Sequence, residues 1–206
     1  VYKRNYYGCV TALDEQVGRL RDKLRMLGVS ENTLLCFCSD NGPEGNAGKA
    51  PGSAAGFRGR KRSLYEGGVR VPGIMEWPGT IAAGSSTDFP AVTSDYLPTV
   101  LDLLGVSYPS GRPIDGASLA DVMRGNNVKR ATPIGFQSKA QVAWHSGSHK
   151  LYSGDSGETW ELYKLETDPA EAIDLATTHP ELTAQLRSEV GRWQASCKRS
   201  DGGADY

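Results

Sequence analysis

An acid, an amide and a glycine end an apolar stretch in the first quarter of the chain. Residues 33–38 (TLLCFC) are followed by Ser39 and then by Asp40, Asn41 and Gly42. A carboxylate and an amide carbonyl supply the oxygen ligands that Ca²⁺ and Mg²⁺ prefer. The sequence Asp-Asn-Gly is also typical of a tight turn, because Asp and Asn side chains bond to nearby backbone. Spacing alone therefore leaves both a metal site and a plain turn open.

A cluster of cations follows further along the chain. Arg58, Arg60, Lys61 and Arg62 lie close together at the end of a glycine-rich stretch. Lysine is a compact point charge that suits a sulfate or phosphate oxygen, so the cluster could hold an anion. It could equally be a solvated basic loop, or a nuclear-localisation or nucleic-acid patch. The formal net charge of -1 gives no general argument for a nucleic-acid partner.

The histidines and cysteines give weaker signals. His145 and His149 have helical spacing, but the Ser-Gly-Ser between them is not helical and no glutamate follows the first histidine. Cys36 and Cys38 share one face of the apolar stretch and lack the second pair of ligands expected of a zinc site. We expect these two thiols to be buried as small hydrophobic groups. The chain also lacks an EF-hand loop at Asp40, a P-loop and a GxSxG elbow.

Hydrophobic periodicity predicts the elements that would position Asp40 and Asn41. Apolar residues at intervals of three and four, from Tyr6 to Leu27, predict an amphipathic helix that packs on something large. Residues 33–38 are continuously apolar, which is typical of a strand covered on both sides, as in a parallel sheet. In such sheets ligands bind beyond the carboxyl ends of the strands. The predicted strand would therefore hold both oxygen donors at a binding edge.

The rest of the chain divides into two parts that differ in their predicted secondary structure. Residues 42–60 predict a long loop, followed by a strand at 71–77 and helices at 94–104 and near 118–124. Short strand-like runs at 133–137, 141–145, 149–152 and 160–165 then predict a small antiparallel sheet, and residues 180–197 a last helix. We predict an α/β fold with one part at 1–130 and a second, small subdomain of antiparallel sheet and helix at 131–206. No run of about 18 apolar residues predicts a transmembrane helix.

These motifs, taken in order, resemble the type I sulfatases of the alkaline phosphatase superfamily. The resemblance rests on YYGCVTALDEQVGRL, NTLLCFCSDNGPEG, GRKRSLYEGGVRVPGIMEWPG, TSDYLPTVLDLLG, IDGASLADVMRG and LYKLETDPAEAIDLA, which extend over nearly the whole chain. It implies part of an alkaline-phosphatase-like α/β sandwich, followed by the small antiparallel sheet and terminal helix. It also implies an arylsulfatase-like hydrolase that converts a sulfate monoester, small-molecule or carbohydrate, into an alcohol and sulfate.

The resemblance also implies roles for particular residues. Asp40 and Asn41 would be ligands of a divalent cation, usually calcium. Lys61 would contact the sulfate of the substrate and act in catalysis. Residues 66–68 and Arg70 would shape the turn and support the loop. In the family, a formylglycine made from Cys or Ser attacks the sulfur and expels the alcohol.

The chain departs from the family pattern at the nucleophile. The motif Cys/Ser-x-Pro-x-Arg is absent from residues 1–206, as are the two early aspartates that complete the metal site. In the family these lie before the point at which this chain begins. We therefore expect the C-terminal portion of a sulfatase that does not turn over alone and, with half a metal site, binds calcium poorly.

Two other functions remain open on the sequence. A related phosphomonoesterase, phosphodiesterase or phosphonate hydrolase would share the metal site at Asp40 and Asn41. A non-catalytic chain that binds or regulates a sulfatase would need neither nucleophile nor complete metal site. Members of the family are mostly exported or lysosomal, and the chain itself gives no direct indication of its location.

Overall fold

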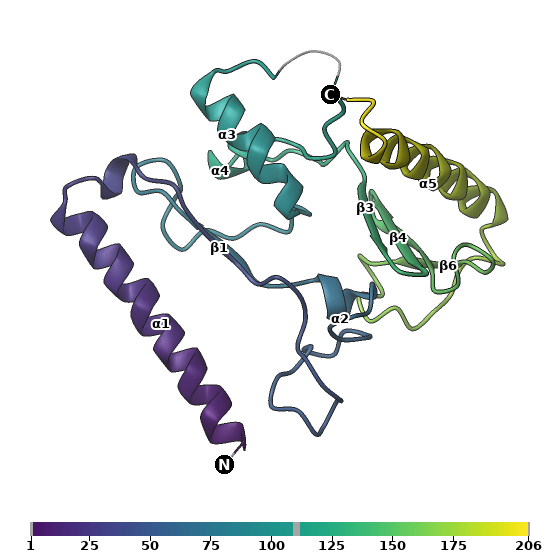
Figure 1. Cartoon of the computed structure of the whole chain (residues 1–206), viewed down its shortest axis with the longest axis horizontal. Helices are drawn as coiled ribbons and strands as arrows, with labels where there is room; N and C mark the ends of the chain where they lie inside the picture. The colour runs from purple at the N-terminus through teal and green to yellow at the C-terminus, as the bar shows by residue number, and fades with distance from the viewer. Residues whose placement is uncertain (1, 109–111, 206) are drawn as a thin grey trace.

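The computed structural model describes residues 2–108 and 112–205 (Figure 1). The helices are α1 (Tyr2–Met26), α2 (Glu66–Val69), α3 (Tyr96–Leu104), α4 (Ala120–Met123) and α5 (Pro180–Asp201), with 3-10 turns η1 (Ser30–Asn32) and η2 (Thr93–Asp95). The strands are β1 (Leu35–Cys38), β2 (Gly73–Glu76), β3 (Ile134–Ser138), β4 (Gln141–Ser146), β5 (His149–Ser153) and β6 (Glu161–Lys164). No helix among the described residues combines the length and the apolar character needed to cross a membrane. The predicted mixed α/β class is confirmed.

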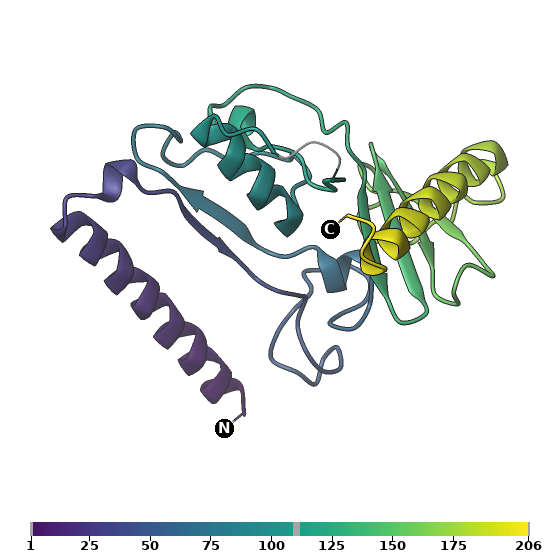
Figure 2. The ribbon, with the colours of Figure 1, turned by 45° about the horizontal axis from the view of Figure 1, so that its top comes forward.

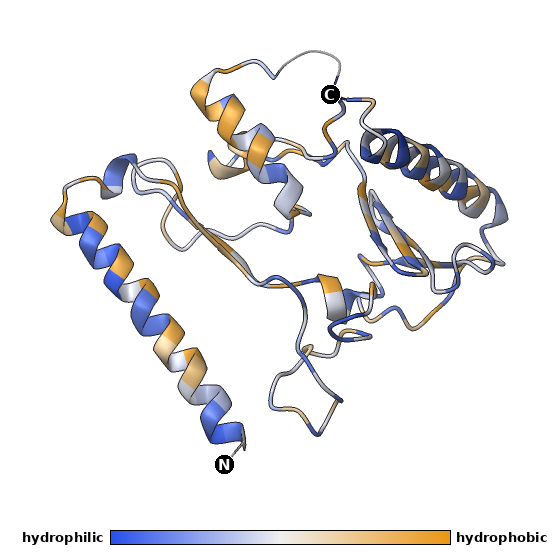
Figure 3. Ribbon diagram, in the orientation of Figure 1, coloured by the Kyte–Doolittle hydropathy of each residue, from blue (hydrophilic) through white to orange (hydrophobic). Residues whose placement is uncertain are grey.

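The first helix stands apart from the other elements in both ribbon views (Figures 1 and 2). Its amphipathic character was predicted, and Figure 3 shows hydrophobic positions recurring along its length. However, Leu13 is 53% exposed and Leu20 is 47% exposed, whereas Val17 and Leu24 are partly buried, so the described part of the chain covers the apolar face only in part. Arg21 ties the helix to β2 through a two-point contact with the Glu76 carboxylate, at 2.6 and 2.9 Å.

The first two strands correct one expectation from the sequence. β1 pairs with β2 in antiparallel register, with Cys36 opposite Met75 and Phe37 opposite Ile74. Cys36 and Phe37 are exposed rather than buried. The predictions of a parallel partner and of a buried Cys36 are therefore wrong within residues 2–108 and 112–205. A continuous apolar run shows that a strand needs cover, but the direction of pairing depends on how the long following loop returns the chain.

The C-terminal part forms the predicted antiparallel sheet, in the order β3-β4-β5-β6. One face packs against α5 through a core whose buried members are Val142, Trp144, Leu151, Leu162, Leu186 and Val190. The other face packs against the segment that contains α2, where Leu64 and Tyr65 meet Tyr152. The sheet therefore lies between the terminal helix and the segment that carries the YEGG motif. The terminal helix is longer than predicted and ends at Asp201.

A buried ion pair joins the middle of the chain to the start of this sheet. Asp95, at the end of η2, receives hydrogen bonds from Arg130 at 2.7 and 2.9 Å and from the backbone of Ala117 at 2.7 Å. The side chain of Arg130 is 5% exposed and that of Asp95 is fully buried. Such a pair fixes segment positions because removing either partner would leave an uncompensated buried charge. The predicted boundary at residue 130 stays a prediction.

Candidate active site

Asp40 and Asn41 lie just beyond the carboxyl end of β1, as the sequence predicts. The backbone N–H of Asn41 donates to Asp40 Oδ1 at 3.0 Å, and Asn41 Nδ2 donates to the Gly42 carbonyl at 2.9 Å. Ser39 Oγ donates to the Asn41 carbonyl at 3.0 Å, which closes the turn. These contacts use one oxygen of the Asp40 carboxylate and leave Oδ2 of Asp40 and Oδ1 of Asn41 without a hydrogen bond inside the described part of the chain. Asp40 and Asn41 can therefore form the turn and still present oxygen atoms to a metal ion.

Gly42 brings this turn into backbone contact with α2. Its N–H donates to the Gly68 carbonyl at 2.8 Å. A Cβ atom at Gly42 would lie 1.9 Å from the carbonyl oxygen of Gly67, which no side chain can tolerate. The glycine after the Asp-Asn pair is therefore required by close packing as well as by the turn itself.

Lys61 lies in the loop beside the same turn. Its backbone N–H donates to the Pro43 carbonyl at 3.2 Å, which places it next to the segment that follows Asn41. Lys61 also borders an open hollow of about 790 Å³ together with Lys3, Tyr7 and Glu44. The backbone of Lys61 therefore lies beside the segment that follows Asp40 and Asn41, whereas neither of these two residues lines the hollow.

The arginines beside Lys61 are engaged with protein groups. Arg60 Nη2 donates to the carbonyls of Glu44 and Gly52, at 3.0 and 2.8 Å. Arg62 pairs with the Glu44 carboxylate, and this hydrogen bond holds the pKa of Glu44 below its ordinary value. The ammonium of Lys61 makes no hydrogen bond or ion pair with any residue that the structure describes. Lys61 therefore differs from Arg60 and Arg62 beside it, because its ammonium remains available to an external anion.

Arg58 anchors the loop to the C-terminal sheet. Its guanidinium lies 3.8 Å from the centre of the Tyr65 ring and donates to Tyr163 Oη at 2.6 Å. The phenols of Tyr65 and Tyr163 both donate to Glu161 Oε2. Burial, together with these hydrogen bonds to a carboxylate, raises the pKa of both tyrosines, so they remain neutral donors. The cluster fixes the beginning of the loop that carries Lys61.

A buried group of charges fixes the end of the same loop. Lys150 Nζ lies 2.8 Å from Glu66 Oε1 and 2.9 Å from Glu171 Oε1, and Lys150 and Glu171 are each 1% exposed. The backbone N–H of Glu66 also donates to Glu171 Oε2 at 2.7 Å. Burial raises the pKa of Glu171, and the nearby Lys150 opposes that shift. The sequence analysis assigned Glu66 to the turn and missed Lys150 and Glu171. The only indication in the sequence was a lysine inside a short predicted strand, and this did not indicate which carboxylates it contacts.

Asp40 and Asn41 offer fewer oxygen donors than a divalent cation needs. They present a carboxylate and an amide oxygen on a turn fixed by backbone contacts. Within the described ranges, no three His, Cys, Asp or Glu side chains are grouped so that they could hold a metal ion. His145 of β4 lies opposite Lys150, and His149 of β5 lies opposite Ser146, in a different sheet from β1. Since Ca²⁺ takes about six to eight oxygens, Asp40 and Asn41 alone would not complete its coordination shell.

Two family models and known proteins of similar sequence match this chain. The sequence model of the Sulfatase family matches residues 2–106, and that of "N-sulphoglucosamine sulphohydrolase, C-terminal" matches residues 57–196. The N-acetylgalactosamine-6-sulfatase of Rattus norvegicus is 33% identical over 180 residues, which cover 85% of this chain and 34% of the relative.

Solved structures extend the similarity to the fold. Ps i-CgsB in complex with k-i-k-neocarrahexaose aligns with a TM-score of 0.83 and 26% identity, over 95% of this chain and 44% of that chain. BT4656 in complex with D-glucosamine-2-N, 6-O-disulfate aligns with a TM-score of 0.69 and 26% identity, over 93% and 40% respectively. The chain therefore spans less than half the length of each of these proteins.

Proposed function

Because the chain belongs to the sulfatase family, we propose that this protein is a sulfuric ester hydrolase that releases sulfate from a sulfated carbohydrate. The observation that carries the proposal is the corner formed by Asp40, Asn41 and Lys61. The ammonium of Lys61 has no partner among the described residues, and its backbone is bonded to Pro43, next to the two oxygen donors. A similar protein is an N-acetylgalactosamine-6-sulfatase, which supports a carbohydrate rather than a simple aryl ester.

Lys61 binds and orients the sulfate group. The backbone that carries it is held in place because the loop is bonded on both sides, through Arg58 to Tyr163 and through Glu66 to Lys150. A charge held in place before the reaction stabilises negative charge that develops on the sulfate oxygens without further reorganisation. Glu44 lies near Lys61, and its pairing with Arg62 reduces the competition of that carboxylate for the ammonium.

Asp40 and Asn41 hold a divalent cation, which we propose to be calcium. The cation, when bound, neutralises the anionic ester and stabilises charge on its oxygens. Asp40 contributes the charge that attracts the ion, and Asn41 contributes a neutral oxygen of fixed direction. We place the formylglycine and the remaining cation ligands outside residues 1–206, because these residues lack the Cys/Ser-x-Pro-x-Arg motif. On this proposal, residues 1–206 alone bind calcium weakly and do not turn over.

The test is made on the product of the complete reading frame that encodes this chain. Initial rates are measured with 4-nitrophenyl sulfate and with N-acetylgalactosamine 6-sulfate, and in parallel with a phosphate monoester and a phosphonate monoester. We expect Lys61→Ala and Asp40→Ala each to lower kcat/KM for the sulfate ester by about 100-fold or more. Removal of the cation with a chelator should abolish the activity, and added Ca²⁺ should restore it.

Lys49→Ala is the matched control, since Lys49 is an exposed cation of the same loop and does not border the hollow at Lys61. It should retain the kcat/KM of the unaltered protein. Unchanged activity in Lys61→Ala would remove the assignment of that residue. A higher kcat/KM for the phosphate or phosphonate ester than for both sulfate esters would replace the proposed function by the corresponding phosphoryl chemistry, and absence of all activity would favour a non-catalytic chain.

A further inference from the structure

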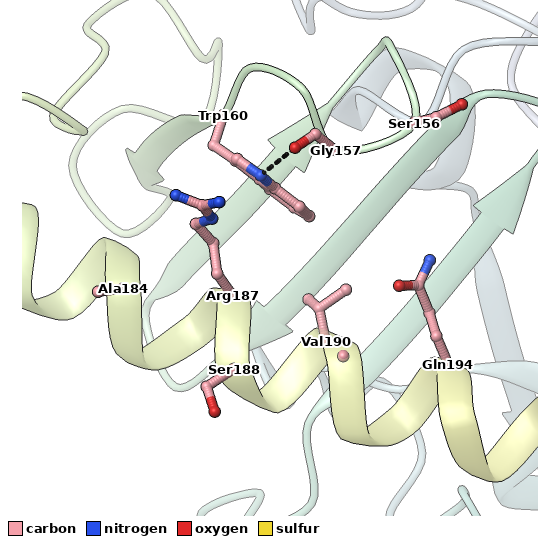
Figure 4. Close-up of a pocket in the computed structure, with 9 residues that line it drawn as sticks. Ser156, Gly157, Trp160, Ala184, Arg187, Ser188, Val190 and Gln194 are labelled. Carbon is pink, nitrogen blue, oxygen red and sulfur yellow. Dashed lines mark hydrogen bonds between the residues drawn. The ribbon is translucent and has the colours of Figure 1, made fainter.

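A second hollow, of about 420 Å³, lies between α5 and the turn that leads into β6 (Figure 4). Trp160 forms one wall, and Arg187, Val190 and Gln194 of α5 form the other. Its volume is near the lower end of the range for ligand sites, about 300–1,000 Å³. None of its lining residues takes part in the corner that contains Asp40 and Lys61, so the proposed hydrolysis leaves this hollow unexplained.

The indole of Trp160 is held in place by its own turn. Its Nε1–H donates to the Gly157 carbonyl at 2.9 Å. Gly157 has φ +92, which strains any other residue, and a Cβ atom there would lie 3.2 Å from Cζ2 of the indole, a tight contact with the ring. The aromatic wall is therefore rigid before any ligand arrives.

Two further side chains stiffen this turn. Ser153 Oγ accepts from the backbone of Gly157 at 2.9 Å. Asp155 accepts from the backbone and hydroxyl of Thr159, and these hydrogen bonds lower the pKa of Asp155 to about 2. The turn is therefore crosslinked within itself and does not depend on a ligand for its order. A preorganised site binds more tightly because less entropy is lost on binding.

Arg187 supplies an uncompensated charge beside the ring. Its guanidinium carbon lies 5.8 Å from the centre of the Trp160 ring. It forms no ion pair or hydrogen bond with any residue in the described ranges, and no carboxylate is among the residues that line the hollow. Gln194 Nε2 donates to Gln137 at 3.3 Å, which leaves the Gln194 amide oxygen as an acceptor toward the hollow. The site therefore combines an aromatic ring, a guanidinium that contacts this ring but has no carboxylate partner, and neutral hydrogen-bonding groups.

We propose that this hollow is a non-catalytic binding site for one unit of an anionic saccharide. The C–H bonds on one face of a pyranose carry slight positive charge and suit the negative face of an indole ring. A sulfate or carboxylate on the sugar matches the planar fork of Arg187. Sugar hydroxyls match the Gln194 amide. A purely apolar ligand would leave Arg187 unmatched, and an inorganic anion would leave Trp160 unused.

The test uses isothermal titration calorimetry on the complete chain at about 150 mM salt, where non-specific charge attraction is screened. The probe is a chondroitin tetrasaccharide with sulfate on each N-acetylgalactosamine, and all variants carry Lys61→Ala so that the first site does not contribute. We expect Arg187→Gln to weaken binding by at least about tenfold. Trp160→Ala should weaken binding to a similar extent.

Two matched variants keep the result interpretable. Arg199→Gln removes the same charge from the same helix outside the hollow and should leave affinity unchanged. Gly191→Phe fills the hollow from a helical position where an added Cβ meets nothing within 4 Å, so it should abolish binding while the helix remains folded by circular dichroism. Absence of binding heat in the parent protein, equal affinity of Arg187→Gln and the parent, or an equal loss in Arg199→Gln would each overturn the proposal.

Discussion

Lys150 is almost completely buried, yet its ammonium serves two carboxylates that come from different parts of the chain. Glu66 begins α2, Lys150 lies within β5, and Glu171 follows β6. Two buried acids and one base leave a net negative charge if all three ionise, and burial accordingly raises the pKa of Glu171. The group is favourable only while each charge keeps its partner, because an isolated buried ion is strongly unfavourable.

We therefore predict that Lys150→Met destabilises the chain by about 3–5 kcal/mol, since it leaves Glu171 without a cation and Glu66 with only the more distant, half-exposed Arg70 at 3.9 Å. The measurement is urea unfolding followed by circular dichroism at pH 7. Lys129→Met, at an exposed position, should change the free energy of unfolding by about 0.5 kcal/mol or less. Adding Glu66→Gln to Lys150→Met should recover part of the loss, because one of the unpaired charges is removed. A cost below about 1 kcal/mol for Lys150→Met would contradict this account.

The same residues show how far a sequence can specify a site. Asp40, Asn41 and Lys61 could be found because their chemical types and local spacing carry the signal, and the motifs around them occur in a fixed order. The role of Lys150 could not be found in this way, since its partner Glu66 is 84 positions away and the contact exists only once β5 packs against α2. Local patterns identify groups that face a ligand more readily than groups that face one another.

The short helix α2 depends on close contact between backbones. A Cβ atom at Gly68 would lie 1.9 Å from the Ser63 carbonyl oxygen, and one at Gly67 would lie 2.3 Å from the Gly59 carbonyl oxygen. The two glycines therefore allow α2 to pack directly on the loop that contains Lys61. This contact gives a physical reason for the Gly-Gly pair, which the sequence analysis could assign only to a turn.

We predict that Gly68→Ala destabilises the chain by about 1–3 kcal/mol or more, because the loop must move to admit the methyl group. Urea unfolding measures the loss, and hydrogen exchange should become faster in residues 58–64. Gly191→Ala is the control, since an added Cβ there meets nothing within 4 Å and the residue lies inside a helix. It should stabilise by about 0.5–1 kcal/mol. Equal changes in the free energy of unfolding for the two substitutions would show that helix propensity, not packing, determines the effect of Gly68→Ala.

Elements differed in how well the sequence predicted them. The C-terminal sheet was predicted because its strands are consecutive and each pairs with its neighbour, as in β4 and β5 joined at Gly147. The pairing of β1 was not predicted, because its partner β2 follows a long loop that leaves the direction undetermined. Periodicity reports which face of an element needs cover, and it does not report which element provides it.

The molecule as a whole is uneven in its packing. The two ribbon views place α1 and α5 at opposite ends (Figures 1 and 2). The apolar side chains of α5 lie against the four-stranded sheet, whereas those of α1 are open to solvent. The large exposed side chains of α1 and the turn after it are Tyr6, Tyr7, Val10, Leu13, Leu20, Met26, Leu27 and Val29. Exposed apolar patches of this kind favour association with another surface.

We predict that residues 1–206, prepared as a single polypeptide, bind a hydrophobic dye and self-associate at micromolar concentration through this face. Leu13→Gln together with Leu20→Gln should lower dye fluorescence and shift the molecular mass in sedimentation toward the 22.1 kDa of one chain, because both side chains lie on the exposed face. Arg19→Gln, which alters a polar position of the same helix, should leave both readings unchanged. Burial of α1 by association would also slow hydrogen exchange along residues 2–26 as concentration rises. If the unaltered chain is monomeric and binds no dye, like the double variant, the exposed face of α1 does not cause self-association.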